Sequence, residues 1–110
     1  MISEGMLDIL AKREEKKIER EEVYEKLFDE YGDMQVIVAI EELSELQKEL
    51  CKSLRKKGQM LNLCEEIADV KIMLEQIISI YGLCEEEIDY IIDKKIERTK
   101  ERLLWKTQFI

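Results

Sequence analysis

Proline is absent from all 110 residues of this chain, and glycine occurs only 4 times. Proline is the strongest breaker of an α-helix and glycine the next, so long helices meet almost no local obstacle here. Apolar residues recur at helical spacing, and no segment alternates with the period of two that a strand needs. The sequence therefore predicts an all-α fold, a four-helix bundle in a single domain over residues 1–110.

Residues 1–31 form the first predicted segment, a long and strongly charged helix that begins at about Ser3. Every residue from 12 to 22 is charged except Ile18, with mixed signs that support an exposed helix or an arm packed on another subunit. Gly32 suits the left-handed residue that follows a helix, and Asp33 suits the next N-cap. The chain from 33 to 104 then carries three further helices.

The boundaries of those three helices follow from local signals. The second helix is predicted over about 34–54, and the third from an Asn62–Glu65 capping box to Tyr81. Gly82 ends the third helix, and the fourth runs from about Cys84 to 104.

Composition narrows the functional classes. A formal net charge of −8 argues against nucleic acid or an anionic membrane as a partner, since both need a positive surface. It leaves room for phosphate ligands when a divalent cation lies between them and carboxylates. With no histidine and 3 cysteines lacking a CxxC spacing, neither a zinc site nor a disulfide framework is expected. Free thiols and the lack of a long apolar run predict a soluble, cytoplasmic protein.

Carboxylates occupy unusual places on the helical wheels. The second helix has an apolar face, bordered on one side by Glu42, Glu45 and Glu49; the face comprises Val36, Ala39, Leu43, Leu46 and Leu50. On the third helix, Glu66 lies inside the apolar stripe and Asp69 lies next to it. A carboxylate in an apolar stripe is costly unless it is paired or binds a cation.

The fourth helix also carries charges at its apolar face, but these are positive. Lys95 falls within its predicted inner face, and Arg98 borders it; the apolar part of that face is Ile88, Ile91, Ile92, Thr99 and Leu103. Two interpretations follow. Lys95 pairs with Glu66 in a purely structural bundle, or the i,i+3 carboxylate pairs of two packed helices supply four oxygen ligands to Mg²⁺ or Mn²⁺. A di-iron bundle is excluded because it needs histidine.

Three short segments, in this order, resemble the motifs of a known family. Residues 41–46, EELSEL, resemble the EExxE motif of the all-α nucleoside triphosphate pyrophosphohydrolases, and residues 62–70, NLCEEIADV, resemble their ExxD motif. Residues 95–98, KIER, resemble the basic KxxR of their last helix. The resemblance covers about residues 31–104 and is greatest to the small single-domain MazG-like proteins of bacteria and phages.

This resemblance implies a Mg²⁺-dependent enzyme, with Mn²⁺ as a possible substitute, that cleaves a nucleoside triphosphate to the monophosphate and pyrophosphate and so cleans the nucleotide pool. It implies that Glu45 and Glu42 are the catalytic carboxylates and that Lys95 and Arg98 bind phosphate. The implied metal ligands are Glu42, Glu45, Glu66 and Asp69.

Several expectations are less specific. Gln35 and Val38 are candidates for contacting the base, with Tyr31, Phe28 and Trp105 as further candidates. A homodimer or tetramer is expected because a chain this short leaves apolar surface uncovered, at Tyr24, Leu27, Trp105 and Phe109. The alternative functions are a non-catalytic helical interaction protein and a dUTPase-type hydrolase.

Overall fold

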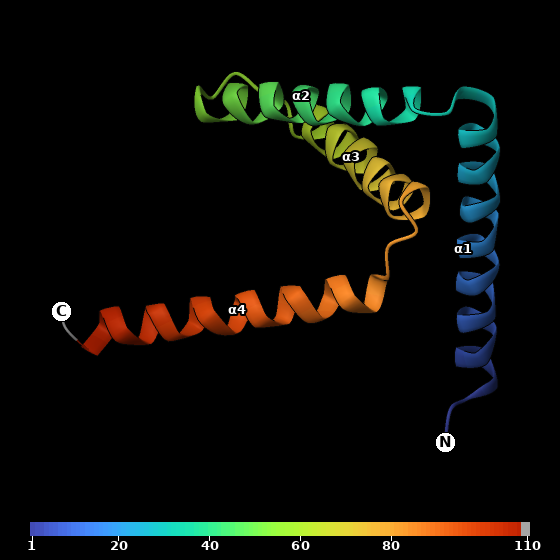
Figure 1. Cartoon of the computed structure of the whole chain (residues 1–110). Helices are drawn as coiled ribbons and strands as arrows, with labels where there is room; N and C mark the ends of the chain where they lie inside the picture. The colour runs from blue at the N-terminus through green and yellow to red at the C-terminus, as the bar shows by residue number, and fades with distance from the viewer. Residues whose placement is uncertain (109–110) are drawn as a thin grey trace.

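The computed structural model describes residues 1–108 and consists of four helices, α1 (Glu4–Tyr31), α2 (Met34–Leu54), α3 (Met60–Ile80) and α4 (Glu85–Gln108) (Figure 1). No strand occurs among residues 1–108, so the predicted all-α class is confirmed. Within this part of the chain, no helix is both long enough and apolar enough to cross a membrane. Phe109, which was expected to add to the uncovered apolar surface, lies outside the described residues.

The helix ends follow the chemistry of a few residues. The Ser3 hydroxyl accepts a hydrogen bond from the Met6 N–H at 3.2 Å and caps α1. Gly32 has a φ of 55° and its N–H donates to the Phe28 carbonyl at 2.7 Å, which ends α1 as predicted. Asp33 precedes α2, but its side chain makes no capping hydrogen bond.

The start of α3 differs from the prediction. Asn62 lies inside the helix, which begins at Met60 after the extended residue Gln59. The Leu63 N–H already donates to the Gln59 carbonyl at 3.1 Å, so the first turn is complete before the predicted cap. Asn62 and Glu65, which have the spacing of a capping box, therefore lie within the first two turns of α3 and do not cap its N-terminus.

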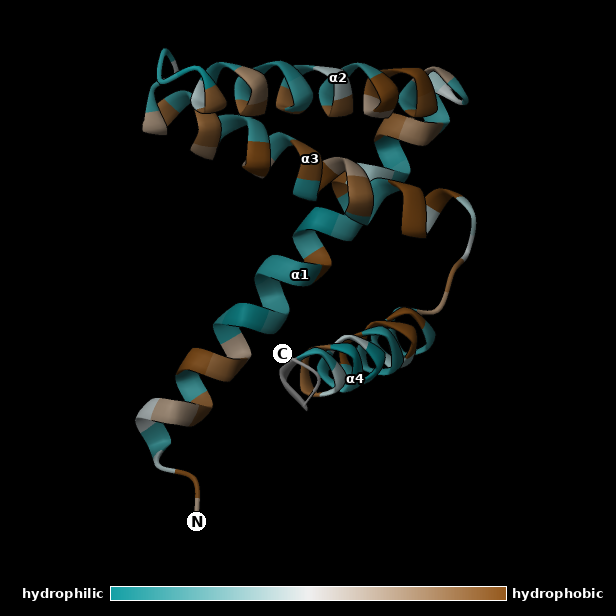
Figure 2. Ribbon diagram, turned by 90° about the vertical axis from the view of Figure 1, so that its left-hand side faces the viewer, coloured by the Kyte–Doolittle hydropathy of each residue, from teal (hydrophilic) through white to brown (hydrophobic). Residues whose placement is uncertain are grey.

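The α2 and α3 helices form an antiparallel hairpin, and α1 lies across it (Figures 1 and 2). The apolar side chains buried here are Tyr24, Ala39, Val70 and Met73. Two buried polar side chains, Gln35 and Gln76, accompany them. Tyr24 was expected to be uncovered, but α3 covers it within the same chain.

The side of α2 that faces α3 is not the one expected. Ala39 is buried, but Leu43 and Leu50 remain 45% and 48% exposed. Gln35 is buried and Glu42 and Glu49 are half-buried, so α2 is rotated about its axis toward its acidic border. Carboxylates thus lie in the α2–α3 contact while much of the apolar stripe stays open.

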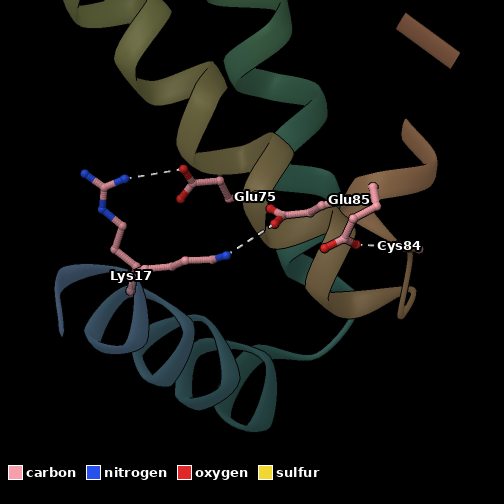
Figure 3. A network of polar contacts seen from close by, with 6 residues as sticks. Lys17, Glu75, Cys84 and Glu85 are labelled. Carbon is pink, nitrogen blue, oxygen red and sulfur yellow. Dashed lines mark hydrogen bonds and ion pairs between the residues drawn. The ribbon is translucent and has the colours of Figure 1, made fainter. Parts of the chain in front are cut away.

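The α4 helix stands apart from the other three in both views (Figures 1 and 2). Ile91, Ile92 and Leu103, expected on an inner face, are 45%, 49% and 61% exposed. The first residue of α4, Glu85, is held to α1 by an ion pair of 3.6 Å with Lys17 (Figure 3). This placement leaves Ile91 and Ile92 about half exposed in the single chain.

Candidate metal centre

Three carboxylates meet where α2 crosses α3. Glu42 comes from α2, and Glu66 and Asp69 come from successive turns of α3. Each offers one oxygen, and the three oxygens lie within 4.8 Å of one another. The i,i+3 spacing puts Glu66 and Asp69 on one side of α3, as the sequence predicted. The structure therefore brings together three of the four predicted metal ligands.

The electrostatics of this cluster disfavour its fully ionised, metal-free form. Burial, reinforced by the charges of Asp69 and Glu66, raises the pKa of Glu42 above its usual value. Burial also raises the pKa of Glu66, and Asp69, Glu45 and Glu49 add their repulsion. The Oε2 atom of Glu66 is buried and has no hydrogen-bond partner. A negative charge on that buried oxygen would be stabilised by a bound cation.

Glu45, the fourth predicted ligand, lies at the edge of the cluster. It is exposed and forms an ion pair with Lys48 at 3.2 Å. Its charge still contributes to the raised pKa of both Glu42 and Glu66. The structure thus places Glu45 beside the group of three oxygens rather than within it.

Glu49 is a carboxylate that the sequence motifs did not select. It is half-buried, its charge acts on Glu66, and it accepts an ion pair from Lys52 at 3.1 Å. The available signal was its position seven residues after Glu42, on the same side of α2. Glu49 therefore extends the acidic border of the hairpin by one turn.

The predicted phosphate-binding residues are not part of this cluster within one chain. Lys95 and Arg98 are exposed on α4, which stands apart from the α2–α3 hairpin. No ion pair joins Lys95 to Glu66, so the structural pairing considered from the sequence is not formed. The cationic and anionic halves of the predicted site occupy separate parts of the molecule.

The base-binding candidates Gln35 and Val38 lie on α2 on the same side as Glu42, seven and four residues before it. Gln35 is buried and Val38 half-buried. Tyr31 and Trp105 are 56% and 64% exposed and lie on other helices. Only Gln35 and Val38 therefore share a face with the acidic cluster.

A separate open groove of about 720 Å³ runs between α1 and the α3–α4 turn. Arg20 crosses it to Glu75 at 3.4 Å (Figure 3). The Tyr24 hydroxyl also donates a hydrogen bond to Glu75. Both cations and carboxylates line its walls, among them Arg13, Lys17, Glu21, Glu25 and Glu85. The polar contacts in this groove connect α1 to α3 and α4. The groove is separate from the acidic cluster.

The donor set at the α2–α3 crossing fits a hard divalent cation. Carboxylate oxygens are the ligands that Mg²⁺ and Mn²⁺ prefer, and the partnerless Glu66 oxygen is directed into the protein instead of into solvent. In comparisons with known proteins, no family model, no curated protein and no solved structure matches this chain. The functional assignment thus depends on the motifs and on this geometry.

Proposed function

We propose that the protein is a Mg²⁺-dependent nucleoside triphosphate pyrophosphohydrolase, as the motif resemblance implies. The observation that carries this proposal is the meeting of Glu42, Glu66 and Asp69 oxygens within 4.8 Å at the crossing of two helices. These three residues come from the EExxE-like and ExxD-like segments. Two motifs distant in sequence thus converge on one place suited to a divalent cation.

Glu42, Glu66 and Asp69 hold the cation, and Glu45 completes the set from the exposed edge of the cluster. A bound Mg²⁺ or Mn²⁺ supplies charge neutralisation between this acidic site and the triphosphate, and it polarises the α-phosphate. The partly buried position of Glu42 and Glu66 strengthens each of these electrostatic interactions by excluding water.

The exposed carboxylate of Glu45 accepts a proton from the attacking water. The water oxygen bonds to the α-phosphorus while the bond from that phosphorus to the α–β bridging oxygen breaks. Pyrophosphate leaves, and the nucleoside monophosphate keeps the new oxygen. Lys95 and Arg98 bind the phosphate oxygens and stabilise the charge that develops on the leaving group. This role requires α4 to lie against an α2–α3 hairpin, which association of chains would provide.

The proposed biological role is the removal of unwanted nucleotides from the cytoplasmic pool by a homo-oligomer. Gln35 and Val38 are proposed to contact the base, because they share the face of α2 that carries Glu42.

The test is hydrolysis of a panel of ribo- and deoxynucleoside triphosphates with Mg²⁺ or Mn²⁺ in ¹⁸O-labelled water. We expect pyrophosphate as a product and the label in the nucleoside monophosphate, since the attack occurs at the α-phosphorus. Label in inorganic phosphate would instead identify attack at the γ-phosphorus and reject the proposed reaction. Including dUTP in the panel distinguishes a dUTPase-type specificity.

One observation favours a second candidate, a non-catalytic helical interaction protein. The α4 helix exposes Ile91, Ile92 and Ile96 and holds its cations away from the acidic cluster. A protein of this kind releases no pyrophosphate from any nucleotide, and Mg²⁺ leaves its melting temperature unchanged.

A further inference from the structure

A second groove lies between α1 and α3, where α1 crosses the hairpin (Figure 2). Its volume is about 600 Å³, within the range of sites that bind small molecules. It is lined by Glu19, Arg20, Val23, Tyr24 and Leu27 of α1 and by Ala68, Lys71, Ile72, Glu75 and Gln76 of α3. This described lining contains none of the carboxylates of the acidic cluster, so the groove is a feature apart from the candidate metal centre.

Gln76 is the most deeply buried residue of this lining, at 4% exposed. On the helical wheel it lies between Ile72, which borders the groove, and Met73, which is buried. Its Oε1 atom has no hydrogen-bond partner within the described part of the chain. Buried polar groups of native proteins are almost always hydrogen-bonded, either to the protein or to a bound molecule, because an unpaired one destabilises the fold. The amide therefore indicates that a molecule in the groove donates a hydrogen bond to it.

The two walls of the groove are apolar and stiff. Val23 of α1 is 53% exposed and Ile72 of α3 is 44% exposed, and both border the groove. Because β-branched side chains have essentially one rotamer in a helix, these walls keep their shape without an occupant. Ala68, one turn before Ile72, has a small side chain that leaves space beside it. A slot of this kind between two helices suits a flat, apolar molecule, which covers both walls from water.

The charges of the lining cancel. Arg20 and Glu75 form an ion pair at 3.4 Å, and the Tyr24 hydroxyl donates its proton to the same carboxylate. Glu19 and Lys71 then add one negative and one positive charge. The described lining thus has no surplus charge to neutralise a phosphate, a carboxylate or an ammonium group. An uncharged occupant fits this groove better than a nucleotide does.

We propose that the groove between α1 and α3 binds a small, uncharged aromatic heterocycle whose ring N–H donates a hydrogen bond to the Gln76 amide. Val23 and Ile72 contact the two faces of the ring. The last side-chain bond of glutamine turns easily, so the amide can bring its oxygen toward the groove when a donor enters. The proposal goes beyond the enzymatic function and is independent of it, because it uses no residue of the acidic cluster.

The test is titration of the isotope-labelled protein with indole, followed by proton–nitrogen correlation NMR spectra. Benzofuran is the matched probe, because it has the shape of indole but carries an oxygen in place of the ring N–H. We expect saturable shifts centred on the residues of the groove, with a dissociation constant for indole on the order of 1 mM. Benzofuran should bind about 5-fold more weakly, since it cannot donate the hydrogen bond.

Three variants locate the site. Gln76→Met keeps the size of the side chain but removes the amide, so it should bind both probes equally and melt no lower than wild type. Ala68→Leu narrows the groove and should weaken the binding of both probes by about 10-fold. Ala11→Leu makes the same change at an exposed residue of α1 outside the groove and should leave both affinities unchanged. Circular dichroism shows whether each variant retains its helices.

Three results would overturn the proposal. A wild type that shows no saturable binding up to the solubility limit of indole would mean that water alone meets Gln76. Equal affinities of wild type for indole and benzofuran would show that the amide makes no hydrogen bond to the occupant. Binding that persists unchanged in a folded Ala68→Leu variant would place the probe elsewhere on the protein. None of these measurements uses nucleotide hydrolysis, so their outcome does not depend on the enzymatic function.

Discussion

Glu42 of α2 and Glu66 of α3 are 24 positions apart in sequence, yet both present a carboxylate oxygen to the same cluster, which Asp69 completes within 4.8 Å. Neither is neutralised by a lysine or arginine within the described residues 1–108. Their negative charges repel each other within the interface between α2 and α3. A contact of this kind is stabilised when a cation binds.

Replacing Glu66 with glutamine should stabilise the metal-free protein and remove its response to Mg²⁺. The amide has no charge to desolvate and does not repel Glu42 or Asp69. We expect a melting temperature above that of wild type in EDTA, by a few degrees, and no further increase with Mg²⁺. Thermal unfolding followed by circular dichroism measures both. The matched control is Glu41→Gln, an exposed glutamate outside the cluster, which should behave as wild type.

The raised pKa values of Glu42 and Glu66 should make the metal-free protein less stable as the pH rises above 4.5. The pKa values of Glu42 and Glu66 are raised above the usual 4.5, so between 4.5 and the raised values the folded protein binds more protons than the unfolded one. The free energy of unfolding therefore decreases with pH in this window. Mg²⁺ should abolish the decrease, because it takes the place of the protons. Urea unfolding between pH 4.5 and 7.5 tests this, and the double variant Glu42→Gln, Glu66→Gln should lack the slope.

Tyr24→Phe should loosen α1 from α3. The Tyr24 hydroxyl donates to the Glu75 carboxylate, and hydrogen bonds to charged groups contribute about 1.5 kcal/mol or more. We expect the free energy of unfolding to drop by about that amount in urea titrations. Tyr31→Phe is the control, since Tyr31 is 56% exposed, and it should cost nothing measurable. An equal loss in both variants would contradict the assigned role of the Glu75 contact.

The same contact predicts a distinct titration. Burial, with help from the hydrogen bond to Glu75, raises the pKa of Tyr24 to about 12 from the usual 10.0. The folded phenol keeps its proton where the unfolded phenol loses it, so this group makes the fold less stable as the pH rises from 10 to 12. Ultraviolet absorbance of tyrosinate should show one late component that disappears in Tyr24→Phe.

The sequence predicted the helices better than the way they pack. Gly32 and Gly82 end helices as expected, with φ of 55° and 59°, because few other residues adopt that conformation. The periodicity of apolar residues identified the apolar faces of α2 and α4, but it did not predict which helices would pack against those faces. Leu43 and Leu50 remain open because α2 turns its acidic border toward α3. Ile91 remains open because α4 meets α1 at its first residue, Glu85, and does not pack along any of the other helices.

The candidate site was predictable to a similar extent. Glu66 and Asp69 could be placed together because three residues along one helix decide their relation. The meeting of Glu42 with them, and the exclusion of Glu45 to the edge, depend on the rotation of α2, which no local pattern fixes. The distance of Lys95 from the cluster depends on the turn at 81–84, where a change of a few dihedral angles redirects the whole of α4.

If the proposed reaction is right, Lys95→Ala and Arg98→Ala should each lower kcat/KM for the nucleotide by about 100-fold, since each removes a cation proposed to stabilise developing charge. Melting temperatures should not change, because both side chains are exposed and neither has an ion pair with the acidic cluster. Lys100→Ala, on the opposite side of α4, is the matched control. Steady-state kinetics of pyrophosphate release measures all three, and equal losses would show that the basic motif has no special role.

The central claim is that Glu42, Glu66 and Asp69 form a divalent metal site, and direct titration with Mn²⁺ tests it most simply. Free Mn²⁺ is followed by electron paramagnetic resonance in wild type, Glu66→Gln and Glu41→Gln. We predict saturable binding to wild type and Glu41→Gln, and binding weakened by more than about 100-fold in Glu66→Gln, since even residues that only support a ligand change affinity by 10–100-fold. Equal binding by wild type and Glu66→Gln, or none by wild type, would contradict the account.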